Sequence, residues 1–179
     1  MSKRKNLKKG YVQVYTGDGK GKTTAALGLA FRAMGAGMRT YIGQFMKGVH
    51  YGELDSAKAA APHITIEQYG SKKFVCLGEK DPKEVERAKK GLEKIRKAMS
   101  SGEYDIVVLD EACTALHFGL IEVSEVLELL KARPKNIELI LTGRGAPQEI
   151  IDAADLVTEM KKIKHYYQKD VPARAGIEK

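Results

Sequence analysis

The chain has 179 residues, which is enough for one compact domain and leaves little room for a second core. Its formal net charge is +8, but five basic residues lie within the first nine positions, so the body is nearly neutral and nucleic-acid binding by a basic face has little support. A content of 43% hydrophobic and 30% charged residues excludes a wholly disordered chain, and the longest apolar run, residues 25–31, is too short to cross a bilayer.

Strands and helices are predicted to alternate along the chain. Short segments rich in β-branched and other apolar residues predict strands at 11–15, 40–45, 63–67, 106–109, 138–142 and 156–159. Helical spacing and capping signals predict helices at 22–34, from 81 to 100, from 123 up to the Arg133-Pro134 pair, and after Pro147. The N-terminal tail, the stretch at 47–80 and the C-terminal segment after His165 are expected to be mobile.

The order of these elements predicts the fold class. The segment at 106–109 shows no alternation of apolar and polar residues, which indicates a central strand buried on both faces. Strands that alternate with helices imply an α/β fold, with a mainly parallel β-sheet flanked by helices. We therefore expect a basic N-terminal tail at 1–10 and a single α/β domain at 11–179.

The glycine-rich segment at 16–24 is the most informative motif. It lies between a predicted strand and a predicted helix, so its glycines can turn the backbone tightly and direct N–H groups at a phosphate. Lys22 would reach the terminal phosphates, and the hydroxyl of Thr23 would ligate a magnesium or manganese ion. The residues predicted to bind the triphosphate are Gly17, Asp18, Gly19, Lys20, Gly21, Lys22, Thr23 and Thr24.

Two further segments follow predicted strands at the same edge of the sheet. Asp110 and Glu111 follow the fourth strand, where ligands collect in parallel sheets, and would face the ion held by Thr23. An acidic turn after a core strand is the alternative for this pair. Arg144 lies in a glycine turn after the fifth strand and would clamp a phosphate, with a surface arginine as the alternative. We predict that Thr23, Asp110 and Glu111 hold the metal.

The cysteines and histidines give weaker signals. Cys76 and Cys113 lack the spacing of a metal site and favour a reducing, cytoplasmic setting. Cys113 is expected to be a small buried hydrophobic residue and not a reactive thiol. His165 is a candidate base, although a partly exposed packing histidine is the favoured interpretation.

Together these residues resemble the ATP:corrinoid adenosyltransferases of the phosphate-loop type, the enzymes that make adenosylcobalamin. The resemblance extends from about residue 11 to residue 178. Besides the glycine-rich segment it rests on Arg32-Ala33, Gln44-Phe-Met-Lys-Gly48, Val108-Leu-Asp-Glu111, Leu141-Thr-Gly-Arg-Gly145 and Gly176-Ile-Glu178. This combination is far more specific than a phosphate loop alone, and it implies the P-loop NTPase (RecA-like) fold.

The resemblance implies that the cobalt(I) of a corrinoid attacks C5′ of ATP and that the whole triphosphate leaves. Cobalt(I) carries its own lone pair, so no side chain needs to act as a general base. The protein would align C5′ with cobalt and stabilise the charge that grows on the triphosphate, a task that suits Lys20, Lys22 and Arg144. By the same resemblance Arg32 lies near the nucleoside part of ATP, and ATP lies in the loop in reverse of the usual orientation.

The resemblance also implies an aromatic loop at 70–76 that displaces the lower axial ligand of cobalt and so eases its reduction. Phe74 matches one aromatic of this loop and is the predicted catalytic residue there. Cys76 stands where some relatives have tryptophan, and the chain contains no tryptophan. Three explanations stay open: Phe74 with Val75 is sufficient, Tyr69 helps, or a residue of a partner chain helps.

The expected substrates are ATP and a corrinoid, either cob(I)alamin or cob(I)yrinic acid a,c-diamide. A reduced flavoprotein is the expected electron donor, and the resemblance implies a homodimer; no membrane or nucleic-acid partner is expected. In the family an N-terminal segment caps a neighbouring active site, whereas here a disordered solubilising tail at 1–10 is an equal alternative.

Two other functions are weighed against this one. A conventional phosphate-loop ATPase or nucleoside kinase would release γ-phosphate, but Thr16 stands where the standard loop has glycine. An ATP-gated module that binds nucleic acid through its basic tail would show steeply salt-dependent binding, but the nearly neutral body argues against it.

Overall fold

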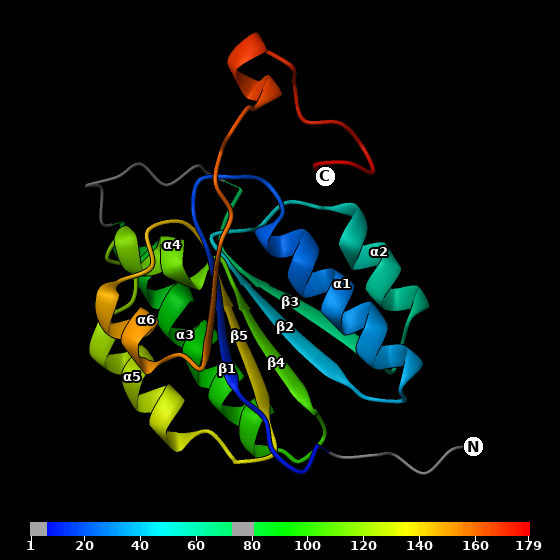
Figure 1. Ribbon diagram of the computed structural model, residues 1–179, viewed down its shortest axis with the longest axis vertical. Helices are drawn as coiled ribbons and strands as arrows, with labels where there is room; N and C mark the ends of the chain where they lie inside the picture. Colours follow the sequence, from blue (N-terminus) through cyan, green and yellow to red (C-terminus); the bar gives the residue numbers. More distant parts are fainter. Residues whose placement is uncertain (1–6, 73–80) are drawn as a thin grey trace.

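The sheet is built from parallel strands. In the computed structural model, which describes residues 7–72 and 81–179, the strands are β1 (Val12–Thr16), β2 (Thr40–Phe45), β3 (Ile64–Tyr69), β4 (Ile106–Asp110), β5 (Glu138–Thr142) and β6 (Leu156–Glu159). They pair in parallel in the order β3-β2-β4-β5-β1-β6 (Figure 1). All six carboxyl ends therefore meet at one edge of the sheet.

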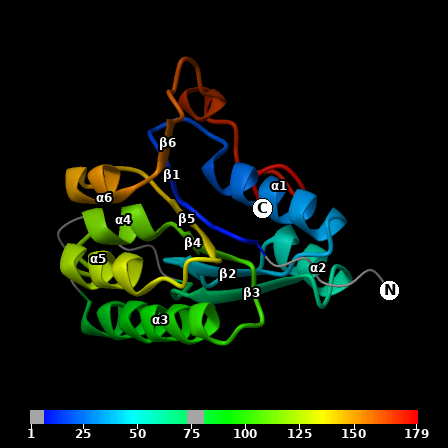
Figure 2. The same ribbon diagram turned by 60° about the horizontal axis from the view of Figure 1, so that its bottom comes forward.

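Helices cover both faces of the sheet, which confirms the predicted α/β class. Helices α1 (Lys22–Gly35) and α2 (Gly52–Ala59) lie on one face. The opposite face carries α3 (Pro82–Ser100), α4 (Ala112–His117), α5 (Val123–Ala132) and α6 (Gln148–Ala153), as Figure 2 shows. A short 3₁₀ helix, η1 (Tyr166–Lys169), follows β6. Within the described parts of the chain, no helix combines the length and apolar character needed to span a membrane.

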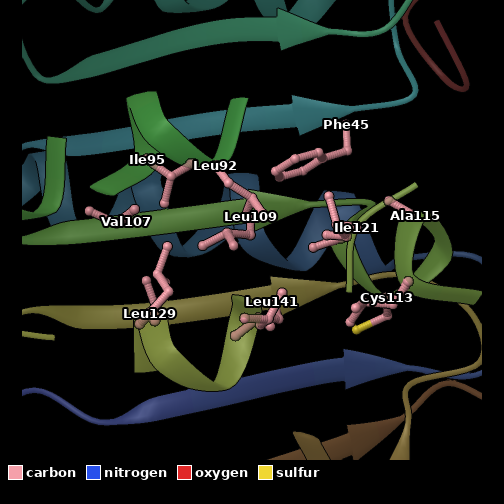
Figure 3. Packing of buried hydrophobic residues seen from close by; sticks show 14 of the residues in the cluster. Phe45, Leu92, Ile95, Val107, Leu109, Cys113, Ala115, Ile121, Leu129 and Leu141 are labelled. Carbon is pink, nitrogen blue, oxygen red and sulfur yellow. The ribbon is translucent and has the colours of Figure 1, made fainter. Parts of the chain in front are cut away.

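The sheet has a hydrophobic core on each face, and the two cores differ in the size of the side chains that the helices contribute. Under α1 the packed residues are small, with Ala26, Ala30 and Ala33 buried against the sheet, so the helix that follows the glycine-rich loop lies close to the strands. The larger core fills the space between the sheet and the opposite layer of helices (Figure 3). Its fully buried members include Phe45, Ile95, Leu109, Leu129 and Leu141.

The predicted elements agree with the structure except for short helices and some boundaries. Strand β4 is buried at every position, as its unbroken apolar run predicted. The Asp81 side chain accepts a hydrogen bond from the N–H of Lys83, so the predicted cap of α3 is confirmed. Helices α2 and α4 were not predicted, because α2 buries a single residue, Ala57, and the six-residue α4 begins directly after β4 with no capping side chain. Phe74 and Cys76 lie outside the described residues.

Candidate active site

The loop between β1 and α1 holds a conformation that requires glycine. Gly17 and Gly21 have φ angles of 95° and 123°, in the region that favours glycine. A Cβ atom on Gly17 or Gly19 would lie 2.5 or 2.6 Å from the carbonyl oxygen of Met160, and the N–H of Gly19 donates to that same oxygen at 2.6 Å. The segment after β6 therefore braces the loop, and only residues without a side chain fit there.

Lys22 lies inside this loop. Its side chain is buried, and its ammonium donates hydrogen bonds to the carbonyl oxygens of Gly17 and Gly19 at 2.6 and 2.7 Å. Burial lowers the pKa of Lys22, and nearby Arg144 lowers it further, while the carboxylates of Glu111 and Asp18 oppose the shift. The lysine is thus held at the N-terminus of α1, where backbone N–H groups and the helix dipole favour an anion.

Thr16 explains the departure of the loop from the standard pattern. It is the last residue of β1, it is buried, and its hydroxyl accepts a hydrogen bond from the N–H of Ala146 at 3.3 Å. A position inside a strand does not require glycine, so a threonine fits there and the tight turn begins at Gly17. The hydrogen bond from Ala146 connects the end of β1 to the loop after β5.

Asp110 is the centre of a buried hydrogen-bond network and makes four hydrogen bonds. Its Oδ1 accepts from the hydroxyls of Thr23 and Thr142 at 2.8 and 2.7 Å. Its Oδ2 accepts from Lys47 at 2.9 Å and from the amide of Gln44 at 3.1 Å. A carboxylate offers about four acceptor sites. Asp110 is therefore saturated and orients the hydroxyl of Thr23, whose lone pairs stay free for a ligand.

Glu111 differs from Asp110 although the two are adjacent. It has a left-handed backbone conformation, with φ of 59°, which turns the chain sharply between β4 and α4. Its N–H donates to Thr142 at 2.9 Å, and its Oε2 accepts from the hydroxyl of Thr114 at 2.6 Å. Glu111 is half-buried and lines the cavity described below. Of the two predicted acidic metal ligands, Glu111 is the one that faces this cavity.

Lys47 is a site residue to which the sequence analysis gave no role, although it lies in the matched segment at 44–48. It follows β2, lies 2.9 Å from Asp110 and 3.4 Å from Glu53, and its ammonium stands over the ring of Tyr51 at 5.2 Å. Burial alone would lower the pKa of Lys47, but the charges of Asp110 and Glu53 outweigh it and raise the pKa. A lysine two positions beyond a strand that ends at this edge was the signal that could have revealed it.

These groups surround a cavity of about 610 Å³ at the carboxyl edge of the sheet. A volume of this size is typical of small-molecule sites. The predicted residues that line it are Asp18, Gly19, Lys20, Gly21, Lys22, Thr23, Thr24, Glu111 and Arg144. His165, residues 176–179 and residues of α2 also line it. The structure therefore brings most of the predicted phosphate and metal residues into one place.

Other predicted residues lie elsewhere or have other roles. Arg32 is exposed in the last turn of α1, about 15 Å along the helix axis from Lys22. Burial raises the pKa of Cys113 to about 12, which agrees with a buried hydrophobic residue. The Tyr69 hydroxyl is hydrogen-bonded to that of Tyr41, and the Tyr69 ring is buried in the core.

A divalent ion fits this site only if the ligand supplies most of its oxygens. Within residues 7–72 and 81–179, no group of three or more His, Cys, Asp and Glu side chains could hold a metal. Thr23 and Glu111 line the cavity with oxygen atoms free to ligate, which is the kind of partial shell that Mg²⁺ accepts when phosphates and water complete it.

The chain is similar in sequence to a known protein family and to several curated proteins. The model of the ATP:corrinoid adenosyltransferase BtuR/CobO/CobP family matches residues 8–178. A corrinoid adenosyltransferase of Sinorhizobium is 36% identical over 97% of this chain and 82% of its own length, and that of Escherichia coli K12 is 32% identical over 95% and 86%. An uncharacterized protein of Nostoc is 39% identical over 87% of this chain, which spans 45% of that protein.

Solved structures with lower sequence identity share the fold. The flagellar accessory protein FlaH of Methanocaldococcus jannaschii has a TM-score of 0.56 at 12% identity, over 86% of this chain and 72% of its own. A KaiC-like protein of Pyrococcus horikoshii has a TM-score of 0.56 at 16% identity, over 87% and 74%. These likenesses support the P-loop NTPase fold and carry no argument about the reaction.

Proposed function

The chain belongs to the ATP:corrinoid adenosyltransferase family, and we propose that it transfers the 5′-deoxyadenosyl group of ATP to cob(I)alamin or cob(I)yrinic acid a,c-diamide. The observation that carries the proposal is the placement of Lys22 inside a glycine loop that lines the cavity, with Arg144 lining the same cavity and close enough to act on the Lys22 charge. This arrangement binds a triphosphate and leaves the rest of the nucleotide in the cavity.

The negative charge that develops during the reaction lies beside the cationic side chains of the site. The cobalt(I) lone pair forms the bond to C5′, the C5′–O5′ bond breaks, and its electron pair stays on the leaving triphosphate. Lys22, Arg144 and the N–H groups of the loop stabilise that charge, and they are in place before the reaction begins. No proton is transferred at the reacting atoms, so the reaction needs no general base, and the buried Asp110 beside the cavity is saturated with donors.

A magnesium or manganese ion would be held by Thr23 and Glu111 together with the phosphates of ATP. When bound, the ion would neutralise charge on the triphosphate. Asp110 takes the role of a positioning residue for Thr23 in this proposal and is not a direct ligand. Arg32 does not line the cavity, so its contact with the nucleoside part of ATP stays a prediction from the family resemblance.

Several parts of the proposal rest on the family resemblance. Phe74 is proposed to face the lower side of the corrinoid, with a reduced flavoprotein as electron donor. A cytoplasmic homodimer, with the tail at 1–10 capping a neighbouring site, completes the proposal. Of that tail the structure describes residues 7–10, where Gly10 donates its N–H to the carbonyl of Lys135 and so anchors the start of the domain.

Product analysis tests the proposal. With ATP and chemically reduced cob(I)alamin, we expect the light-sensitive absorption spectrum of a cobalt–carbon bond and one intact triphosphate for each corrinoid consumed. Lys22→Ala should reduce turnover by at least about a hundredfold, the range found when one preorganised donor to a developing anion is removed. ADP and phosphate without adenosylated corrinoid, or near-normal turnover of Lys22→Ala, would contradict it.

A further inference from the structure

The end of the chain folds back over the phosphate loop, far from it in sequence. After η1 the chain returns toward the N-terminal end of α1, as Figures 1 and 2 show. Residues 174–179, here called the C-terminal clasp, form a turn in which the N–H groups of Ile177, Glu178 and Lys179 approach the carbonyl oxygen of Arg174 at 3.0–3.2 Å. Residues 176–179 line the same cavity as Lys22.

Glu178 ties this turn together. Its carboxylate accepts hydrogen bonds from the backbone N–H of Arg174 at 3.0 Å and from the guanidinium at 3.2 Å, and it also bonds to the hydroxyl of Tyr166. Arg174 and Tyr166 hold the pKa of Glu178 far below its usual range, so the residue is ionised at any neutral pH. The side chain of Glu178 is 19% exposed, which is low for a glutamate near the end of a chain.

Lys20 connects the clasp to the phosphate loop. Its ammonium donates to the carboxylate of Glu178 and to the carbonyl oxygen of Ile177, both at 3.0 Å. Burial alone would lower the pKa of Lys20, but the hydrogen bonds to Glu178 and Tyr166 together outweigh it and raise the pKa. Lys22 points into the loop, whereas Lys20 points out of it toward the clasp. The two lysines of the loop therefore have different partners.

We propose that Glu178 is a positioning residue for ATP: through Lys20 it seats the C-terminal clasp on the phosphate loop and completes the wall of the nucleotide cavity. This inference rests on the proposed function for the identity of the nucleotide. The acceptor positions of Glu178 are occupied by Arg174, Tyr166 and Lys20, so the carboxylate acts through the clasp and does not bind the nucleotide itself.

The geometry also sets the size of the effect. The side chain of Lys20 is 40% exposed, and partly exposed ion pairs of this kind are weak. The closed position of the clasp is therefore favoured by only a small free energy, and the clasp can open to admit a nucleotide. Loss of the pair should weaken ATP binding by up to about fivefold, the upper end of the effect of a partly exposed ion pair.

The test compares Glu178→Gln with Asp170→Asn in the full chain. Both changes remove one negative charge from the C-terminal segment, and Asp170 has a left-handed conformation that asparagine tolerates. ATP affinity is measured by titration calorimetry in the absence of corrinoid. We expect binding weaker by up to about fivefold for Glu178→Gln and an unchanged affinity for Asp170→Asn. Unchanged or tighter binding by Glu178→Gln would overturn the proposal, the second result by showing that Glu178 competes with the triphosphate.

Two further measurements separate positioning from a general loss of stability. The Michaelis constant for ATP should rise in Glu178→Gln, while kcat at saturating ATP and the Michaelis constant for the corrinoid should not change. Saturating ATP should slow tryptic cleavage after Arg174 in the unmodified chain, and less so in the variant. The proposal would be overturned if kcat and both Michaelis constants worsened to the same extent, or if ATP did not change the rate of tryptic cleavage. Because affinity is measured without corrinoid, failure of adenosyl transfer would leave this result standing.

A double-mutant cycle with Lys20→Met, Glu178→Gln and the variant that carries both changes separates the effect of Glu178 from the contribution that Lys20 itself makes to phosphate binding. If the clasp acts through this pair, Glu178→Gln should have little further effect on ATP affinity once Lys20 is methionine. Full additivity of the two changes would show that Glu178 acts by another route, and the proposal would fail.

Discussion

Replacement of Lys47 by methionine tests the buried network at the floor of the cavity. Asp110 is fully buried and the side chain of Lys47 is 15% exposed, so the change would leave a buried carboxylate without its cation. Breaking a buried pair by removal of one partner costs about 3–5 kcal/mol. Asp110 would keep three of its four hydrogen bonds, from Thr23, Thr142 and Gln44, which places the expected cost near the lower end, about 3 kcal/mol.

The assay is thermal and urea unfolding of Lys47→Met, Asp110→Asn and the double variant. For a chain of 179 residues, a loss of about 3 kcal/mol lowers the midpoint by about 6–12 °C. The double variant should be more stable than Lys47→Met, because the uncompensated charge is then absent. A loss below about 1 kcal/mol for Lys47→Met, or strict additivity in the double variant, would refute the reasoning.

Two other predictions follow from particular positions. Gly143→Ala should destabilise the protein by more than about 2 kcal/mol in thermal unfolding, because its φ is 135° and a Cβ would lie 2.6 Å from the backbone of α4; Gly28→Ala on α1, with open space around it, should be neutral or stabilising by up to about 1 kcal/mol. In a Cys76→Ser background, the thiol of Cys113 should resist alkylation at pH 8 until the protein unfolds, because its pKa is about 12 in the folded protein against about 9 when free; rapid alkylation of the native protein would contradict this. The same shift favours the folded state below pH 9, and this contribution is lost as the pH rises from 9 through 12.

The sequence predicted the elements that have strong local signals. Strands β2, β5 and β6 begin and end at the predicted residues, and the glycine-rich loop lies where strand and helix predictions meet. Those signals are local: apolar runs, turn glycines and the Asp81 cap act within a few residues. Helix α2 carries no such signal, since its N-cap residue Tyr51 makes no side-chain capping bond and the helix is mostly exposed.

The site was predicted in its parts but not in its connections. Spacing after parallel strands correctly placed Glu111 and Arg144 at the cavity, because the carboxyl ends of β4 and β5 are neighbours. It could not show that Lys47 is one of the four donors that saturate Asp110, since that contact depends on the path of the chain after β2. Nor could it show that Glu178 reaches Lys20, a contact between residues 158 positions apart.

The central claim is that this chain holds the triphosphate as a leaving group, so that the bond to the sugar carbon is the one that breaks. Adenosine triphosphate labelled with ¹⁸O at the oxygen between C5′ and the α-phosphorus distinguishes this from phosphoryl transfer. With cob(I)alamin present, mass spectrometry should find the label in triphosphate and none in the adenosylated corrinoid. Label retained in ADP, with unlabelled phosphate released, would contradict the account.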